Sequence, residues 1–405
     1  MMRSALTSVP TPEGWVERPL GEIVDFLNSR CRQIKGTGRA KMKGDIPYYG
    51  ASGIVDYVND YNFDEDLILL GKIGENIISR VKPLAFKISG KAWVSSNTHA
   101  FNPRDFVSID YLAEYLESLS YERFNSGSAQ PYLSPKSCQS IPAVFPANKI
   151  EQELIAKALN NVNILIYELE EVLAKKRLIK RGILQQLLSG EKRLPGFSGK
   201  WDEKTFGEIF DFYPTATNSR SELTEDGDAF YIHYGDIHTK FCGHLDFQKT
   251  SIPRIGKNQC KNAALLKNGD WIIADVSEDF DGIGMSVEVS GLEDGQQAIS
   301  GLHTFLLREK KSMYAPGFKG YLSYSLNLRK QYMRVMTGMK VFGVTKTALR
   351  NLVLPVPGIN EQNAIVSILS DMGDEILALE EKLSKTRKIK QAMAQDLLTG
   401  KIRLV

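Results

Sequence analysis

The stretch ILQQLLSGEKRL (residues 183–194) returns near the end of the chain as MAQDLLTGKIRL (residues 393–404). Extending the comparison upstream aligns residues 169–194 with residues 379–404 at a shift of 379 − 169 = 210, and roughly half of the positions are identical. The two copies also begin alike, with WVERPLGEI from Trp15 and WDEKTFGEI from Trp201. This repeat indicates two copies of one structural unit in a single chain.

Each copy combines a part rich in short β-type runs with a part that predicts a long helix. Runs such as DLILLG and DWIIADV, interrupted by Gly, Asn and Asp, are typical of strands and turns. The second part, residues 149–189 and 360–399, has no internal proline, and its apolar residues recur every three or four positions. Each such stretch predicts an amphipathic helix of about 40 residues, or ~60 Å at 1.5 Å per residue. Gly190 and Gly400 are the predicted C-caps.

Two helices of this length need partners for their apolar seams, since neither can pack along one side of a domain of this size. Each copy supplies the partner for the other. The sequence therefore predicts an α+β fold, with two β-rich globular domains in a pseudo-twofold repeat, each followed by a long helix, and with the helices paired as an antiparallel coiled coil. The predicted boundaries are 1–148 for the first domain, 149–193 for its helix, 194–358 for the second domain and 359–405 for its helix.

The composition is that of a globular protein, with 42% hydrophobic and 24% charged residues among 405. A formal net charge of +3 neither requires nor excludes a nucleic-acid partner, so the local distribution of charge has to decide. The four cysteines form no C-x-x-C pair, which favours a reducing compartment. Because the sequence has neither a secretory signal nor an apolar run of about 20 residues, we expect a soluble, cytoplasmic protein with no membrane partner.

Basic residues gather at corresponding places in both β-rich parts. The stretch RCRQIKGTGRAKMK (residues 30–43) has no acidic residue, and such a loop suits contact with DNA phosphates. A second acid-free stretch, residues 329–346, corresponds to residues 123–136, where Asn125, Ser128 and Gln130 can hydrogen-bond to bases or phosphates. Solvated loops are the alternative for any single stretch. The predicted DNA-binding residues are Arg30, Arg32, Lys35, Arg39, Lys41, Lys43, Gln130, Lys240, Lys249, Arg254, Lys257, Lys261, Arg334, Lys340 and Lys346.

The sequence predicts no catalytic residue. It contains no G-x-x-x-x-G-K-[ST] loop, no G-x-S-x-G elbow and no H-E-x-x-H motif. The nearest approach to an Asn/Asp-Pro-Pro-aromatic methyltransferase motif, at residues 102–104, lacks both the second proline and the aromatic residue. This chain is therefore not expected to be the methyltransferase, nor to hydrolyse ATP by a phosphate loop.

The sequence contains two clusters of residue types that can bind metals, and neither is interpreted as a metal site. The spacing of His233, His238, Cys242 and His244 matches no common zinc motif, so we interpret these residues as packing or DNA-contacting groups. The acidic residues of the second cluster are interpreted as an acid-rich turn rather than a nuclease centre; they are Asp275, Glu278, Asp279 and Asp281. His99 and His303, which we align with each other in the repeat, are interpreted as structural residues of apolar strands.

The whole pattern resembles the specificity subunit of type I restriction-modification systems. The resemblance rests on W-x-x-x-x-[LF]-G-E-I, a variable β-rich part, a proline shortly before Glu-Gln at the helix entry, and the helix ending LL-[ST]-G-x-x-RL, all present twice. It covers nearly the whole chain and is strongest at residues 146–194 and 357–404. A two-headed DNA-binding protein that serves a different modification or defence system would show the same features and remains the alternative.

The resemblance implies that each β-rich part is a target recognition domain for one half of a bipartite DNA sequence, with the helices fixing the spacer. It implies no catalysis and no cofactor in this chain. The implied partners are double-stranded DNA, two modification subunits that bind S-adenosylmethionine and methylate adenine, and restriction subunits that use ATP and magnesium. The charged flanks of the helices already favour protein docking over DNA, and the implied docking residues are Glu151, Gln152, Arg177, Lys180, Glu361, Gln362, Arg387 and Lys390.

Overall fold

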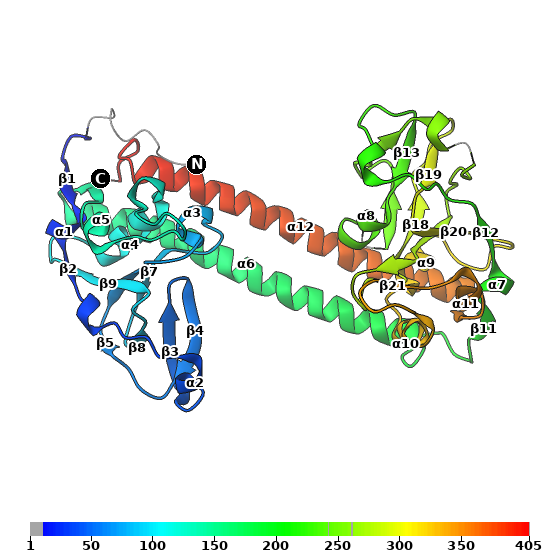
Figure 1. The fold of residues 1–405 in the computed structure, drawn as a ribbon, viewed down its shortest axis with the longest axis horizontal. Coiled ribbons are helices and arrows are strands. Elements are labelled where there is room, and N and C mark those ends of the chain that lie inside the picture. The colour runs from blue at the N-terminus through cyan, green and yellow to red at the C-terminus, as the bar shows by residue number, and fades with distance from the viewer. Residues whose placement is uncertain (1–10, 242, 261, 405) are drawn as a thin grey trace. The chain divides into compact units, whose positions relative to one another are not determined.

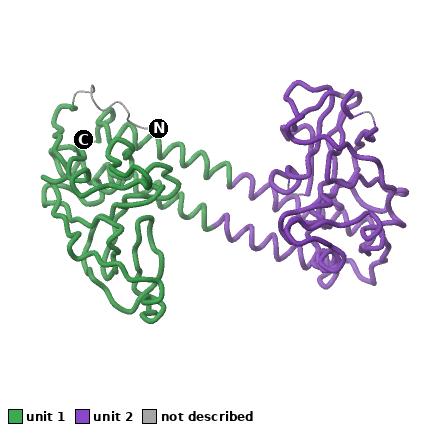
Figure 2. The backbone as a smooth tube through the Cα atoms, in the orientation of Figure 1, with its two compact units in different colours: residues 1–171, 380–405 green, residues 172–379 purple. Residues whose placement is uncertain are grey.

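The computed structural model describes residues 11–241, 243–260 and 262–404. The chain forms two compact units, residues 1–171 with 380–405 (unit 1) and residues 172–379 (unit 2), as Figure 2 shows. Two long helices, α6 (Lys149–Ser189) and α12 (Ile359–Leu397), each give one part to each unit (Figure 1). The two predicted helices are therefore confirmed, at 41 and 39 residues.

Unit 1 is built on two four-stranded sheets and one two-stranded sheet. In the first sheet all neighbours are antiparallel, and the order is β2 (Val24–Phe26), β9 (Thr98–Pro103), β6 (Leu67–Gly71), β7 (Ala85–Ile88). The second has the order β4 (Gly53–Val58), β3 (Lys43–Gly50), β8 (Lys91–Val94), β5 (Phe63–Asp64). The third pairs β1 (Trp15–Pro19) with β10 (Pro142–Pro146), which leads into α6. The strand β6 is buried along its whole length, which explains its uninterrupted apolar sequence.

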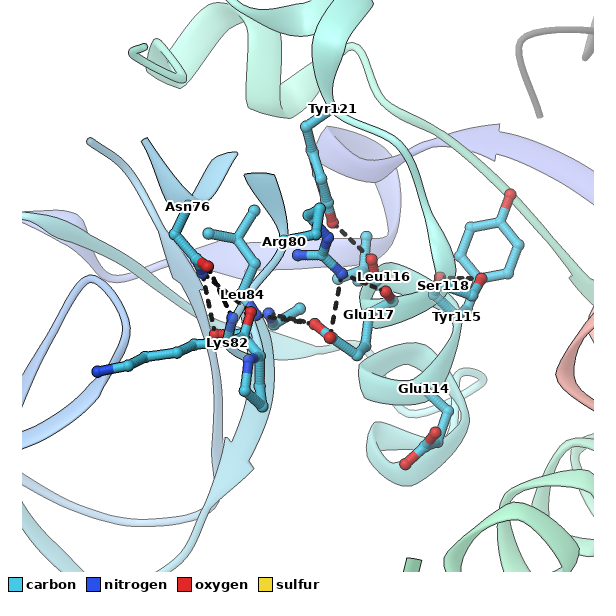
Figure 3. Close-up of polar contacts among 12 residues, drawn as sticks. Asn76, Arg80, Lys82, Leu84, Glu114, Tyr115, Leu116, Glu117, Ser118 and Tyr121 are labelled. Carbon is cyan, nitrogen blue, oxygen red and sulfur yellow. Dashed lines mark hydrogen bonds and ion pairs between the residues drawn. The ribbon is translucent and has the colours of Figure 1, made fainter. Parts of the chain in front are cut away.

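Short helices cover the sheets of unit 1. The side chain of Ser108 caps α4 (Ile109–Ser118) by accepting a hydrogen bond from the N–H of Tyr111. Arg80 ends α3 (Asn76–Ser79) in the left-handed conformation, and its guanidinium lies 3.0 Å from the carboxylate of Glu117 on α4 (Figure 3). The other oxygen of that carboxylate accepts the N–H of Leu84 at 2.9 Å. The contacts of Arg80 and Leu84 with Glu117 thus attach the connection between β6 and β7 to α4.

Unit 2 repeats this plan with a larger first sheet. That sheet has the order β12 (Phe210–Tyr213), β20 (Thr304–Glu309), β16 (Trp271–Ala274), β18 (Ser286–Ser290), β14 (His244–Asp246). A three-stranded sheet follows the order β15 (Arg254–Ile255), β13 (Ala229–Ile232), β19 (Ala298–Ser300). Two strand pairs complete the unit: β11 (Asp202–Thr205) with β22 (Val353–Val356), and β17 (Val276–Ser277) with β21 (Phe342–Gly343). The prediction of an α+β fold with two β-rich parts is therefore confirmed.

The strand registers correct one alignment of the two copies. Phe26 pairs with Phe101 in unit 1, and Phe212, which is equivalent to Phe26 by the WVERPLGEI repeat, pairs with Leu307 in unit 2. The shift from β9 to β20 is thus 307 − 101 = 206, which makes His303 the equivalent of Asn97. The alignment of His303 with His99 was wrong by two residues, because both copies contain a His-x-Phe sequence at different registers.

The long helices run antiparallel within each unit. In unit 1 the start of α6 lies against the end of α12, since Glu151 pairs with Arg403 and Glu170 pairs with Arg387. In unit 2 the opposite ends meet, since Lys176 pairs with Glu375 and Arg193 pairs with Glu361. The core of each unit therefore includes apolar residues of both helices. These are Ile155, Leu159, Leu397 and Leu398 in unit 1, and Leu187, Leu188, Ile365 and Leu369 in unit 2.

This arrangement explains why the LL-[ST]-G-x-x-RL sequence occurs twice. Leu187 and Leu188 end the first helix, yet they are buried in the core of the second copy, at 4% and 1% exposure. Leu397 and Leu398 end the second helix and are buried in the core of the first copy. Each copy thus completes the hydrophobic core of the other. Among the described residues, no helix combines the length and apolarity needed to cross a membrane.

Candidate nucleic-acid interface

A tryptophan, a glutamate and an arginine meet in each unit where one long helix ends and the other begins; we call this group the Trp–Glu–Arg clamp. In unit 2 the guanidinium of Arg193 donates two hydrogen bonds to Glu361, at 2.5 and 2.6 Å, and its centre lies 5.2 Å from the ring of Trp201. The indole N–H of Trp201 also donates to Glu361, at 2.9 Å. Burial alone would raise the pKa of Glu361, but the hydrogen bonds from Arg193 and Trp201 outweigh it and hold the pKa below its usual range.

Unit 1 contains the same clamp. Arg403 donates to both oxygens of Glu151, at 2.5 and 2.7 Å, and lies over the ring of Trp15 at 5.8 Å. Glycine is required beside each tryptophan. Gly190 and Gly400 both have φ +71°, and a Cβ at either position would lie 3.2 Å from the neighbouring indole ring. The repeated sequence Gly-x-x-Arg thus places an arginine on the carboxylate at the start of the partner helix.

The neighbouring glutamines fix each helix on its own β-rich part. Gln152 is fully buried, accepts the N–H of Ser108 at 2.7 Å, and donates to the carbonyl oxygens of Phe106 and Pro146. Gln362 makes the equivalent three bonds, with Ala315, Met313 and Pro357. The two Glu-Gln pairs therefore have a structural role that the sequence did not predict.

The eight predicted docking residues fall into two classes. Glu151, Gln152, Glu361 and Gln362 are at most 2% exposed and are bonded inside their own unit. Arg177 and Arg387 are exposed on the helices, and Lys180 and Lys390 are half-buried. Arg387 pairs with Glu170, and Lys390 lies 3.6 Å from Glu114 of the same unit. Docking of another subunit at these eight residues stays a prediction.

The basic stretch of unit 1 forms one local structure that includes η1 (Asn28–Arg30), α2 (Gly36–Arg39) and the start of β3. Two of its arginines are held by neighbours. Arg30 pairs with Glu65 at 2.7 Å and covers the ring of Phe63, and Arg39 pairs with Asp56 at 3.0 Å. The hydrogen bond from Arg39 lowers the pKa of Asp56. The remaining predicted DNA-binding residues of this stretch are exposed: Arg32, Lys35, Lys41 and Lys43.

The basic residues predicted in unit 2 are scattered over several elements. Lys240, exposed at the end of α8 (Tyr234–Thr239), lies 3.0 Å from the buried carboxylate of Asp236. Lys249 is highly exposed, and Arg254 on β15 covers the ring of Phe230 at 4.1 Å. Lys261 lies outside the described residues, as does the side chain of Lys257. Among the described residues of unit 2, the structure therefore shows no counterpart of the compact basic stretch of unit 1.

The other predicted DNA-binding residues lie near the second acid-free stretch and its counterpart. Gln130 in unit 1 and Lys340 in unit 2 are exposed in loops. Arg334 is exposed on α10 (Leu326–Val335). Lys346 begins α11 (Lys346–Arg350), with its ammonium 5.1 Å from the ring centre of Phe212. Their contact with DNA stays a prediction.

The histidines do not converge on a metal site. His233 accepts the N–H of Gly235, His238 lies 3.2 Å from the carbonyl of Val276, and His244 packs against Tyr321. Cys242 lies outside the described residues, and among those described no group of three metal-binding side chains comes together. Burial lowers the pKa of His244 to about 4, as expected of a neutral packed imidazole.

The acid-rich turn has the expected local role. Asp279 accepts the N–H of Gly282 at 2.6 Å, while Glu278 and Asp281 are exposed. Asp275 differs, because it is partly buried, with its pKa raised by burial, and lies 3.5 Å from the imidazole of His303.

The two strand histidines differ in the structure. His99 is fully buried and bonded to Asn28 and to the carbonyl of Leu133, so its structural role is confirmed. The interpretation of His303 as a structural residue of an apolar strand was wrong. It is exposed in the turn before β20 at φ +60°, where its ring packs edge-on against Tyr234.

Comparisons with known proteins agree with one another. Residues 12–180 and 198–387 each match the family model of the type I restriction modification DNA specificity domain. The chain is 23% identical over 422 residues to a type I restriction enzyme specificity subunit of Methanocaldococcus jannaschii, covering 97% of this chain and 94% of the relative. It is 27% identical over 138 residues to a putative type I specificity subunit of Haemophilus influenzae; that match spans only 35% of the relative.

Solved structures share the fold at low sequence identity. The chain superposes on the crystal structure of a type I restriction-modification S subunit from M. genitalium with a TM-score of 0.61 at 14% identity, covering 95% of this chain and 96% of that one. A chain from a structural study of complex assembly and conformational transition in a type I restriction-modification system gives a TM-score of 0.57 at 15% identity. That match covers 98% of this chain and all of the other.

Proposed function

Since the chain belongs to the family of type I restriction-modification DNA specificity subunits, we propose that it selects the DNA sequence on which such a complex acts. The observation that carries the proposal is the presence of two copies of one DNA-specificity domain in a single chain. A protein with two recognition domains is suited to a DNA target made of two separated half-sites. The proposed target recognition domains are residues 1–148 and 194–358.

We propose that the helical regions, residues 149–193 and 359–405, set the spacer between the half-sites. A continuous helix of 41 residues corresponds to ~60 Å at 1.5 Å per residue. Both ends of this helix are held by a Trp–Glu–Arg clamp, by Glu151 at its start and by Arg193 just after its end. Such a fixed length suits half-sites that recur at about 34 Å per turn of duplex.

We propose that catalysis belongs to partner subunits and that this chain is non-catalytic. The expected partners are two modification subunits, which would bring S-adenosylmethionine, and restriction subunits, which would bring ATP and magnesium. Large apolar side chains exposed on both long helices support a docking role for these helices. They include Tyr167 at 63% and Leu178 at 68% on α6, and Leu377 at 58% and Ile389 at 55% on α12.

The test is a map of methylated bases in the source genome with the gene intact and with the gene deleted. We expect deletion to remove methylation at one split motif, which would give both half-sites and the spacer at once. An unchanged map would refute the proposed function in that cell, and would favour a DNA-binding protein that serves a different system.

A further inference from the structure

The strand ladders place one loop of each unit at the same position in the fold; we call residues 126–132 and residues 337–343 the paired loops. In unit 1 the N–H of Leu133, just after the loop, donates to the carbonyl of Lys72 at 2.8 Å. In unit 2 the N–H of Val344 donates to the carbonyl of Asp275 at 2.9 Å. The equivalence of Lys72 with Asp275 follows from the strand registers, because Leu70 faces His99 and Ile273 faces Phe305.

The paired loops also share a closing hydrogen bond and a glycine at the second position, although only Gly338 has a positive φ, at +119°. Each is closed by a hydrogen bond of 2.9 Å, from Ser126 N–H to the carbonyl of Tyr132 and from Thr337 N–H to the carbonyl of Gly343. The second residue of each loop is a glycine, Gly127 or Gly338. A Cβ on either glycine would collide with the carbonyl oxygen three residues further on. In unit 1 the side chain of Asn125 also accepts the N–H groups of Gly127 and Tyr132. None of these constraints on the loops involves the side chains at the tip.

After each loop the chain enters a short helix in the same way. The hydroxyl of Ser134 caps α5 (Pro135–Gln139), accepting an N–H at 3.0 Å. The hydroxyl of Thr345 caps α11 and accepts an N–H at 3.2 Å. The chain just after each paired loop is thus anchored equivalently, which holds the C-terminal end of each loop in a defined position on its unit.

The tips, in contrast, have unrelated side chains. Residues 128–130 are Ser, Ala and Gln, and all three are exposed. Residues 339–341 are Met, Lys and Val, of which Met339 is 95% and Val341 53% exposed. Beside this second tip, the exposed ring of Phe280 stacks on Phe342 with 4.3 Å between centroids. Exposed apolar side chains in such a group indicate a surface that is covered in a complex.

We propose that the paired loops read bases, one loop for each half-site; this inference rests on the proposed function. A fixed backbone with exchangeable tips is what two readers of different sequences require. Gln130 has the donor and acceptor to bind adenine in the major groove. At the other tip the ammonium of Lys340 suits the guanine acceptors, and Met339 and Val341 suit the methyl group of thymine.

The first experiment exchanges the tips in the full chain assembled with its modification subunits. One variant carries Met339→Ser, Lys340→Ala and Val341→Gln, and its reciprocal carries Ser128→Met, Ala129→Lys and Gln130→Val. Both glycines are kept. We expect the first variant to alter the methylated motif in only one half, and the reciprocal in only the other half, with the spacer unchanged. Methylation of the parental motif at the parental level by both variants would overturn the inference.

A matched control changes an exposed apolar residue and a nearby exposed lysine of unit 2 that lie outside the loop. Leu265→Gln with Lys267→Ala meets this description, since Leu265 is 44% exposed and Lys267 is exposed. The control is expected to keep the parental motif. A change of motif in the control as large as in the tip variant would also count against the loops.

If a tip exchange abolishes methylation, a second measurement tests the inference. Binding of the assembled complex is measured on duplexes that differ by one base pair at a time. We expect discrimination to fall by about 5- to 150-fold at one or two positions of a single half-site. Equal weakening on every duplex would overturn the inference, because that is the behaviour of phosphate contacts. Failure of the proposed function would look different, since the parental chain itself would then direct no motif.

Discussion

The two clamps are built from the same residue types, yet they differ in one hydrogen bond. In unit 2 Glu361 receives donors from both Arg193 and the indole of Trp201. In unit 1 Arg403 donates to Glu151, but the tryptophan does not. The indole nitrogen of Trp15 is buried without a hydrogen-bond partner in the described part of the chain. The repeat therefore preserves the ion pair and the packed ring, while the polar role of the tryptophan belongs to one copy.

The two copies depend on each other most directly where the end of each long helix is buried in the core of the other copy. Leu188→Ala is expected to lower the free energy of unfolding of unit 2 by about 2–5 kcal/mol, because it leaves a cavity at a site only 1% exposed. Leu398→Ala should do the same to unit 1. Hydrogen exchange read out separately for each unit would measure both effects. Leu178→Ala, on the same helix but 68% exposed, is the control and should change little. Destabilisation of unit 1 by Leu188→Ala would contradict the exchanged cores.

Substitution of the buried glutamines beside the clamps compares how much each one contributes to the stability of its unit. Gln152→Ala and Gln362→Ala each remove three hydrogen bonds and leave buried backbone groups unpaired, at a cost of about 1–3 kcal/mol each. Denaturant unfolding should show similar losses for the two variants. Gln186→Ala, at an exposed position, should be near neutral. A loss confined to one variant would mean that only one helix entry depends on its glutamine.

The tryptophans test the difference between the clamps directly. Trp201→Phe keeps an aromatic ring under Arg193 but removes the donor to Glu361. Trp15→Phe removes an indole N–H that has no hydrogen-bond partner among the described residues. We expect Trp201→Phe to cost about 1 kcal/mol more than Trp15→Phe in the free energy of unfolding. Equal costs would show that the hydrogen bond from Trp201 contributes no net stability.

The difference between the clamps should also appear, as a smaller effect, in the loss of stability at acidic pH. The pKa of Glu361 is lowered in the folded chain, so its contribution to stability is present above the unfolded pKa of about 4.3 and is lost as the pH falls through the folded value. Trp201→Phe should bring the folded pKa closer to the unfolded one, and the loss should then begin at higher pH. Acid titration of unfolding, with Trp15→Phe as the control, would measure this. An identical acid profile for Trp201→Phe and the parental chain would contradict the role of the indole.

The long-range architecture could be predicted from the sequence because the repeat and the helical periodicity are strong signals. The helix predicted at residues 149–189 is observed at Lys149–Ser189, and the one predicted at 360–399 at Ile359–Leu397. The clamps were missed, because their members lie far apart in the chain, up to 403 − 15 = 388 residues between Trp15 and Arg403. A signal was nevertheless present, since all three residue types recur at corresponding positions of both copies.

The paired loops could not be aligned from the sequence with the same certainty. Between residues 126–132 and 337–343 only the second position is identical, so the sequences alone give almost no register. The hydrogen bonds around Lys72 and Asp275 supply that register. The mistaken pairing of His99 with His303 had a different cause, a His-x-Phe sequence that both copies contain at different registers. Where backbone geometry is shared and side chains are not, strand pairing is the better guide.

The exchange of helix ends has a consequence for the order in which the chain folds. Unit 2 is one continuous segment, residues 172–379, whereas unit 1 needs residues 380–405 as well as 1–171. A ribosome makes the strands of unit 1 before unit 2, but Leu397 and Leu398 of the unit 1 core emerge only after the whole of unit 2. The second copy can therefore finish folding before the first, although domains usually fold in the order of synthesis. A stop codon just before Leu397 would therefore damage the domain that is made before unit 2.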